Sequence, residues 1–150
     1  MFEIECRTAK DTEALGAKLA SSLRPGDILV LVGELGAGKT LFTGGIAAGL
    51  GVEEQVTSPS FILARVYDTG FIPLVHVDVY RLNSLNEFED LDVLDTSQEA
   101  VLVIEWGGVV ESILPKDHLR IDMLVSDDES RTLRFTGEGS WADRNLSSVR

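Results

Sequence analysis

One segment of this sequence, GELGAGKT at residues 33–40, has residue types and a spacing that predict a definite chemistry. It matches the pattern G-x-x-x-x-G-K-[ST] of a phosphate-binding loop. The glycines allow successive backbone N–H groups to turn inward and surround an anion. Lys39 supplies a positive charge to the β- and γ-phosphates of a nucleotide, and the hydroxyl of Thr40 can ligate Mg²⁺. The segment therefore predicts that the protein binds a nucleotide together with Mg²⁺.

A second group of polar residues lies in LVHVDVY, residues 74–80. Alternation along a strand places His76, Asp78 and Tyr80 on one face and the valines on the other. Asp78 is a candidate to orient a water molecule or a metal-bound water, although an aspartate on an edge strand that faces solvent would give the same pattern. For His76, a packed and hydrogen-bonded side chain is the simpler interpretation.

Glu105 follows the apolar run 101–104. In open α/β sheets, ligands gather at the carboxyl ends of the strands. A carboxylate at that point resembles a Walker B acid and is a natural partner for Mg²⁺; a glutamate that merely ends a strand is the alternative. Trp106 either lines the nucleotide pocket or fills the core.

The segment 52–60 reads as a loop that follows the helix after the phosphate-binding loop. In this loop, Pro59 is flanked in the sequence by residues with hydroxyl side chains, namely Thr57, Ser58 and Ser60. Loops at this place in NTPases sense the γ-phosphate, so Thr57 is a candidate switch residue. An ordinary turn explains the same residues equally well.

Strands and helices must alternate to position these residues. Residues 2–6 alternate as a half-buried strand, and the apolar runs 28–32 and 100–104 indicate strands covered on both faces. Segments 61–67 with 74–80, and 119–125 with 131–136, are expected to form hairpins. Helices are expected after Thr8, over 41–50 with Gly51 as the stop, and after Ser84. The pattern predicts a three-layer α/β fold of the P-loop NTPase type with a mixed parallel and antiparallel sheet.

Length and composition limit the other classes. The 150 residues predict one domain, 1–150, although the tail from about residue 137 is too weakly periodic to assign. The apolar runs are far shorter than the roughly 18 to 20 residues that span a bilayer, so no membrane association is expected. Cys6 is the only cysteine and the N-terminus has no apolar leader, which favours a reducing, cytoplasmic location.

The charge balance argues against nucleic acid as a direct ligand. The sequence has 13 basic and 25 acidic residues, a formal net charge of −12. Such a surface repels polyanions, so strong direct nucleic-acid binding is not expected. Residues 82–115 contain no Lys or Arg, and they form either a solvated acidic face or a docking surface for a basic protein. The acidic residues there are Glu87, Glu89, Asp90, Asp92, Asp95, Glu99, Glu105 and Glu111.

Four segments, in this order, resemble the TsaE family of bacterial ATPases: GELGAGKT, then VTSPSFIL at 56–63, HVDVYRL at 76–82 and VIEW at 103–106. That family is required for threonylcarbamoyladenosine (t6A) modification of tRNA, and the resemblance covers roughly residues 12–131. It implies ATP hydrolysis with Mg²⁺, weak alone and stimulated by a complex of TsaB and TsaD type. It also implies a switch role for Thr57, catalytic and metal roles for Asp78 and Glu105, and a place beside the nucleotide for Trp106.

Two other functions remain alternatives: a kinase for small molecules or nucleotides, and a non-catalytic module whose interactions depend on a nucleotide. A kinase needs arginines that clamp a second substrate, and residues 82–115 supply none. The expected catalytic residues are Asp78, Thr57 and Glu105, and the expected metal ligands are Thr40 and Glu105. The expected nucleotide-binding residues are Gly33, Glu34, Leu35, Gly36, Ala37, Gly38, Lys39, Thr40, Leu41 and Trp106.

Overall fold

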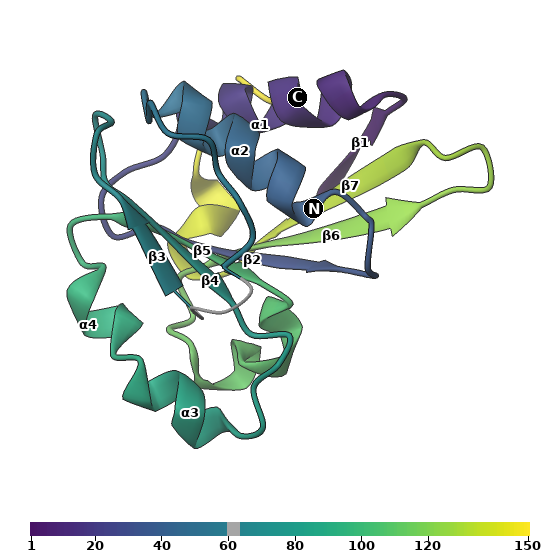
Figure 1. The fold of residues 1–150 in the computed structure, drawn as a ribbon. Helices are drawn as coiled ribbons and strands as arrows, with labels where there is room; N and C mark the ends of the chain where they lie inside the picture. The colour runs from purple at the N-terminus through teal and green to yellow at the C-terminus, as the bar shows by residue number, and fades with distance from the viewer. Residues whose placement is uncertain (60–63) are drawn as a thin grey trace.

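The computed structural model describes residues 1–59 and 64–150. Within them, seven strands form one sheet in the order β1-β7-β6-β2-β5-β4-β3 (Figure 1). The strand β2 pairs in parallel with β5 and β6, and β4 pairs in parallel with β5, whereas β1, β3 and β7 are joined antiparallel. The strands are β1 Phe2–Cys6, β2 Ile28–Gly33, β3 Ala64–Tyr67, β4 Leu74–Asp78, β5 Val101–Glu105, β6 Leu119–Val125 and β7 Arg131–Gly137.

Helices cover both faces of the sheet, which confirms the predicted three-layer α/β fold with a mixed sheet. In Figure 1, α1 and α2 lie along one face, and α3 and α4 lie on the opposite side. Each face has its own buried apolar cluster, one containing Leu19 and Phe42 and the other Phe88 and Val93. The helices are α1 Ala9–Ala20, α2 Lys39–Gly49, α3 Leu85–Asp90, α4 Val93–Thr96, and the short 3₁₀ turns η1 Gly107–Val109, η2 Glu111–Ile113 and η3 Gly139–Asp143.

The first helix begins where the sequence predicts. The backbone N–H of Asp11 donates to Oγ1 of Thr8 at 3.1 Å, and Oδ2 of Asp11 accepts from the backbone N–H of Thr8 at 3.1 Å. This reciprocal pair satisfies two N–H groups that a helix start otherwise leaves without partners. Leu15 and Leu19 form the buried stripe, and Leu23 lies buried in the turn that follows the helix.

The strand β2 is the middle strand of the sheet, and the loop after it leads directly into α2. The helix begins at Lys39 rather than at residue 41 because Gly38, with φ of 100°, ends the loop in a left-handed conformation just before it. Such a conformation is easy for glycine and strained for other residues. Gly45 allows a close contact between helices, since a Cβ there would lie 2.0 Å from the carbonyl oxygen of Glu13 on α1. The helix ends at Gly49 with Leu50 as its C-cap, and Gly51, the predicted stop, follows with φ of 85°.

The hairpins and the tail differ in detail from the sequence pattern. Residues 61–63 of the predicted strand 61–67 lie outside the described residues, as does Ser60, and the described strand begins at Ala64. The next strand ends at Asp78, because the backbone N–H of Tyr80 bonds to the Asp78 side chain at 2.9 Å and turns the chain out of the sheet. In the tail, η3 buries Trp141. No helix within the described residues is both long enough and apolar enough to cross a membrane.

Candidate functional site

The segment 33–40, named the phosphate-binding loop after its sequence pattern, lies between β2 and α2, at the carboxyl end of the central strand (Figure 1). Gly36 and Gly38 both have positive φ, 82° and 100°, and they bend the backbone around the side chain of Lys39. The ammonium of Lys39 donates to the carbonyl oxygens of Gly33 at 2.6 Å and Glu34 at 2.9 Å. The cation is therefore held by the loop itself, at the start of a helix whose free N–H groups favour anions.

Lys39 is only 5% exposed, an unusual place for an ammonium. Burial lowers its pKa from the usual lysine value, and the nearby charges of Glu105, Asp78 and Glu34 partly oppose this shift. A buried cation of this kind favours an anionic ligand, because a phosphate oxygen restores the interactions that it lost with water.

The indole of Trp106 covers Lys39. The ammonium lies 4.0 Å from the centroid of the Trp106 ring. The centroids of the Tyr80 and Trp106 rings are 4.6 Å apart, and the two ring planes are tilted relative to each other. Trp106 has φ of 60°, uncommon for a residue other than glycine. The half-buried ring contacts the apolar cluster below the sheet, as the core interpretation predicts, and it also lies against Lys39. Its place beside a nucleotide stays a prediction.

Thr40 and Glu105 meet although 65 residues separate them. The hydroxyl of Thr40 donates to the carboxylate, at 3.1 Å from Oε1 and 3.1 Å from Oε2. Because a hydroxyl has one proton and two lone pairs, this bond uses the proton and leaves the lone pairs of Oγ1 available to a cation.

This donor set fits Mg²⁺, which prefers oxygen ligands from one or two protein side chains together with phosphates and water. Thr40 supplies a hydroxyl oxygen, and Glu105 supplies a carboxylate that is only 3% exposed. Across residues 1–59 and 64–150, no group of three or more His, Cys, Asp and Glu side chains could hold a metal by itself. Phosphate oxygens and water would therefore have to complete the coordination.

Asp78 lies beside this pair. It occupies the position of β4 that pairs with Glu105 of β5, and β4 lies between β5 and β3, so the edge-strand explanation does not apply. Its Oδ2 accepts from the hydroxyl of Ser58 at 3.2 Å. Asp78 lines a cavity of about 280 Å³ together with Leu35, Ser58 and Trp106. The carboxylate therefore faces the space next to the loop and not the opposite face of the sheet.

Thr57 lies differently from Ser58. Its hydroxyl accepts from Nη1 of Arg65 on β3 at 2.9 Å, and its side chain is exposed. The structure thus brings Ser58, and not Thr57, into contact with Asp78. Leu41, predicted to bind nucleotide, lines a larger cavity of about 570 Å³ together with Thr40 and Glu13.

Comparison with known proteins assigns the chain to a family. The family model described as "Threonylcarbamoyl adenosine biosynthesis protein TsaE" matches residues 6–133. The chain belongs to the TsaE family.

Curated relatives agree with this assignment. A Streptomyces coelicolor protein named tRNA threonylcarbamoyladenosine biosynthesis protein TsaE is 49% identical over 141 residues, which cover 89% of this chain and 95% of the relative. A Bacillus subtilis protein of the same name is 39% identical over 142 residues, covering 93% of this chain and 89% of the relative. The crystal structure of Bacillus subtilis YdiB has a TM-score of 0.77 and 35% identity, and the match covers 92% of this chain and 86% of that one. The recognition of the family from its sequence motifs is thus confirmed.

Sequence reasoning missed three contacts of this TsaE-family site. His76 is buried and hydrogen-bonded, as interpreted, but its partner Glu105 was not expected. The contact of Ser58 with Asp78 was not expected. The contact of Arg131, on β7, with the loop was not expected either. Its guanidinium donates to the carbonyl oxygens of Ala37 at 3.1 Å and Gly36 at 3.2 Å. The alternation of His76 with Asp78 was a usable signal for the first contact. No local signal links Arg131 to a loop about 95 residues away.

Proposed function

We propose that this TsaE-family protein binds ATP with Mg²⁺ and hydrolyses it in support of the t6A modification of tRNA. The observation that carries the ATPase part is the contact between Thr40, at the end of the phosphate-binding loop, and Glu105, at the end of the neighbouring parallel strand. The t6A part rests on the family and on the names of its curated relatives.

Each residue of the proposed ATP site has a definite task. The loop residues 33–38 offer backbone N–H groups to the phosphates, and Lys39 offers a buried positive charge. Thr40 and Glu105 hold Mg²⁺, which when bound neutralises negative charge on the phosphate oxygens. Trp106, which lies over Lys39, limits the access of water to the phosphates.

Hydrolysis further requires a water molecule held in line with the phosphate. In this proposal Asp78 orients that water, since its carboxylate lies beside Glu105 and lines the cavity next to the loop. Thr57 belongs to the proposed switch loop. Its present contact with Arg65 is one that a change of this loop would have to break.

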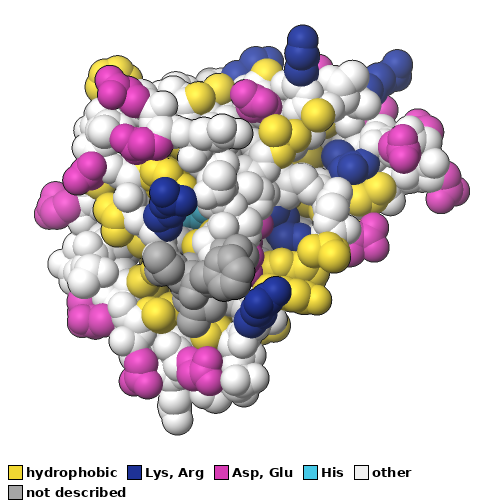
Figure 2. Space-filling model, in the orientation of Figure 1, with side chains coloured by type: hydrophobic (Ala, Val, Ile, Leu, Met, Phe, Trp, Pro, Cys, Tyr) yellow, Lys and Arg dark blue, Asp and Glu magenta, His cyan; other side chains and the backbone are white. Residues whose placement is uncertain are grey.

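The proposed partner is a protein complex of TsaB and TsaD type, and not tRNA itself. The net charge of −12 opposes direct binding to a polyanion. Figure 2 shows Asp and Glu side chains on the surface formed by α3 and α4, in the lower part of the view. A basic protein surface would complement this region and speed up association.

Binding and turnover of ATP by the purified chain test this proposal directly. Calorimetry with ATP and Mg²⁺ should give tight binding, and phosphate release should be slow alone and faster with the partner complex. The control variant Lys39→Ala should lose tight binding, because it removes the cation held by the loop. An affinity changed by less than about twofold, roughly 0.5 kcal/mol, would contradict the assignment of the loop. Transfer of phosphate to a small metabolite would indicate a kinase.

A further inference from the structure

The side chain of His76 contacts Glu105, a residue of the proposed nucleotide site, but has no role in the function proposed above. His76 is fully buried, and its Nε2 lies against Oε2 of Glu105, itself almost fully buried. On β4 its neighbour Leu74 belongs to the apolar cluster beneath α1 and α2, and strand alternation puts His76 on that same face. His76 therefore approaches Glu105 on the side of the sheet that carries α2 and Thr40.

The chemistry of the two groups fixes which one donates. A carboxylate only accepts hydrogen bonds, whereas one nitrogen of a neutral imidazole donates and the other accepts. Against an ionised Glu105, the form that binds a metal, an unprotonated Nε2 would place two acceptors against each other, so Nε2–H is the donor in this contact. The carboxylate then accepts from two sides, from Nε2 of His76 and from the hydroxyl of Thr40.

The other ring nitrogen makes histidine a costly residue among apolar neighbours. In the part of the chain that the structure describes, Nδ1 of His76 is buried and has no hydrogen-bond partner. Burying a polar atom without a partner costs free energy. A leucine would fill a similar volume among apolar neighbours without this cost. The contribution that remains specific to histidine is the hydrogen bond to Glu105.

We propose that His76 is a positioning residue that holds the Glu105 carboxylate in the orientation in which it meets Thr40. This inference rests on the proposed function, because Glu105 is a metal ligand only if Mg²⁺–ATP binds here. Polar groups behind a metal ligand orient it, and their loss weakens metal affinity about 10- to 100-fold. Without His76 the carboxylate keeps its charge but loses one of the two donors that fix its rotamer.

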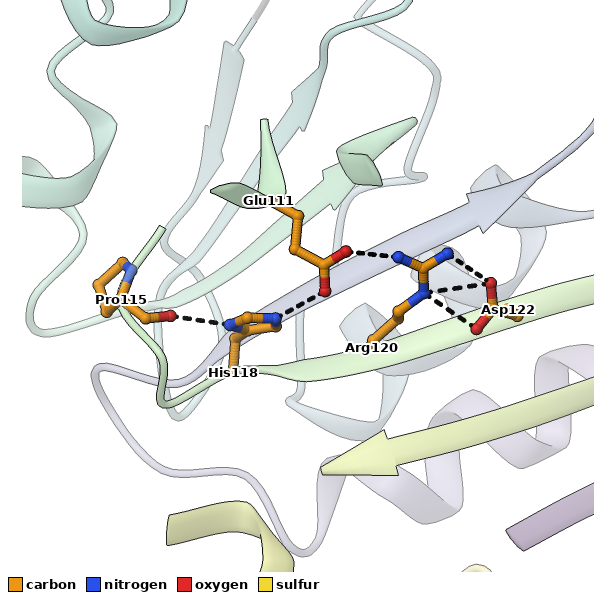
Figure 3. Close-up of polar contacts among 5 residues, drawn as sticks. All are labelled: Glu111, Pro115, His118, Arg120 and Asp122. Carbon is orange, nitrogen blue, oxygen red and sulfur yellow. Dashed lines mark hydrogen bonds and ion pairs between the residues drawn. The ribbon is translucent and has the colours of Figure 1, made fainter. Parts of the chain in front are cut away.

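A second histidine of the same protein provides a matched control. Figure 3 shows His118, whose Nε2 lies 2.8 Å from Oε2 of Glu111 and whose Nδ1 lies 2.8 Å from the carbonyl oxygen of Pro115. Glu111 in turn pairs with Arg120, which contacts Asp122. The contact is again histidine to carboxylate, and His118 is 6% exposed, but the network contains no residue of the phosphate-binding loop.

The experiment compares the Mg²⁺ dependence of ATP binding in His76→Leu, His76→Gln and His118→Leu with the unmodified chain. His76→Leu should require at least about 10-fold more Mg²⁺ and should bind ATP without metal as before. His76→Gln, whose side-chain amide can still donate, should recover most of the Mg²⁺ dependence, and His118→Leu should not change it. A His76→Leu variant with unchanged Mg²⁺ dependence, or a His76→Gln variant as impaired as His76→Leu, would overturn the proposal.

A measurement on the unmodified chain covers the case in which His76→Leu does not fold. Nitrogen-15 NMR of histidine-labelled protein should show a proton on Nε2 of His76, and an unprotonated Nε2 would refute the positioning role. The two proposals fail in different ways. If the unmodified chain shows no Mg²⁺-dependent ATP binding, the proposed function is wrong. If it does and His76→Leu matches it, only the role of His76 is wrong.

Discussion

Asp78 and Glu105 occupy paired positions on two adjacent parallel strands, yet they bond to different elements. Glu105 accepts from Thr40 at the start of α2, whereas Asp78 accepts from Ser58 in the loop that follows the same helix. One carboxylate is therefore attached to the fixed end of the phosphate-binding loop and the other to the candidate switch loop. This arrangement supports the proposal in which Glu105 binds the metal and Asp78 orients the water.

The first prediction separates these roles at Asp78. Asp78→Asn should leave the binding of Mg²⁺–ATP nearly intact, because Thr40 and Glu105 still hold the ion. Partner-stimulated hydrolysis should fall about 10²-fold or more, since a neutral amide with only one acceptor oxygen holds the attacking water in line less well than a carboxylate does. Calorimetry together with phosphate release measures both quantities. Loss of Mg²⁺ binding with unchanged turnover per bound metal would exchange the roles of Asp78 and Glu105.

The second prediction concerns Glu105. Glu105→Gln keeps the size of the side chain and removes its charge. The dependence of ATP affinity on Mg²⁺ should weaken markedly, while ATP binding without metal should change much less. A Mg²⁺ titration at fixed ATP measures the difference. A titration identical to that of the unmodified chain would leave Glu105 with a structural role only.

The third prediction concerns the support of the loop by Arg131. Because its guanidinium bonds to the carbonyl oxygens of Gly36 and Ala37, Arg131→Ala should loosen the loop and weaken ATP binding about tenfold, roughly 1.4 kcal/mol. Arg134→Ala is the matched control, because Arg134 lies on the same strand and pairs with Glu3 at the exposed edge. Equal ATP affinities for the two variants would refute the support of the loop by Arg131.

The fourth prediction tests the acidic surface of α3. Glu89 and Asp90 are both exposed at its end. Reversing both to Lys should weaken association with the proposed partner complex of TsaB and TsaD type and flatten its dependence on salt. The control reverses Asp127 and Asp143, two exposed residues elsewhere, for the same change in net charge. Equal effects of the two double variants would mean that overall charge matters and the surface of α3 does not.

The fifth prediction is a pH effect at Cys6. Burial, assisted by the charges of Asp11 and Glu5, raises the pKa of this thiol in the folded protein, although its contact with Thr12 opposes the shift. The folded state then keeps its proton at a pH where the unfolded chain has lost it, so the contribution to stability is full below about pH 8.5 and declines as pH rises further. Urea unfolding should show a steeper loss of stability above that pH for the unmodified chain than for Cys6→Ala. If the free energy of unfolding falls equally with pH in both proteins, the raised pKa of Cys6 is contradicted.

Much of the fold follows from local sequence patterns. The apolar runs before Gly33 and Glu105 are long enough to specify strands buried on both faces, and the caps at Thr8 and Ser84 begin their helices as predicted. The phosphate-binding loop is equally local. Its glycines, its lysine and the helix that follows are contiguous, so the sequence alone determines what kind of ligand the loop is suited to bind.

The tertiary structure alone decided which distant side chains meet at this loop. Strand order places Asp78 beside Glu105 and brings Arg131 from the far hairpin to the loop, and none of these pairings leaves a trace in the spacing of residues. The same holds for His76, because alternation gives its face of the strand but not the carboxylate that faces it. The physical reason is that periodicity reports the environment of a residue within its own element. Contacts between elements depend on how the strands pair and on how closely the helices pack over them.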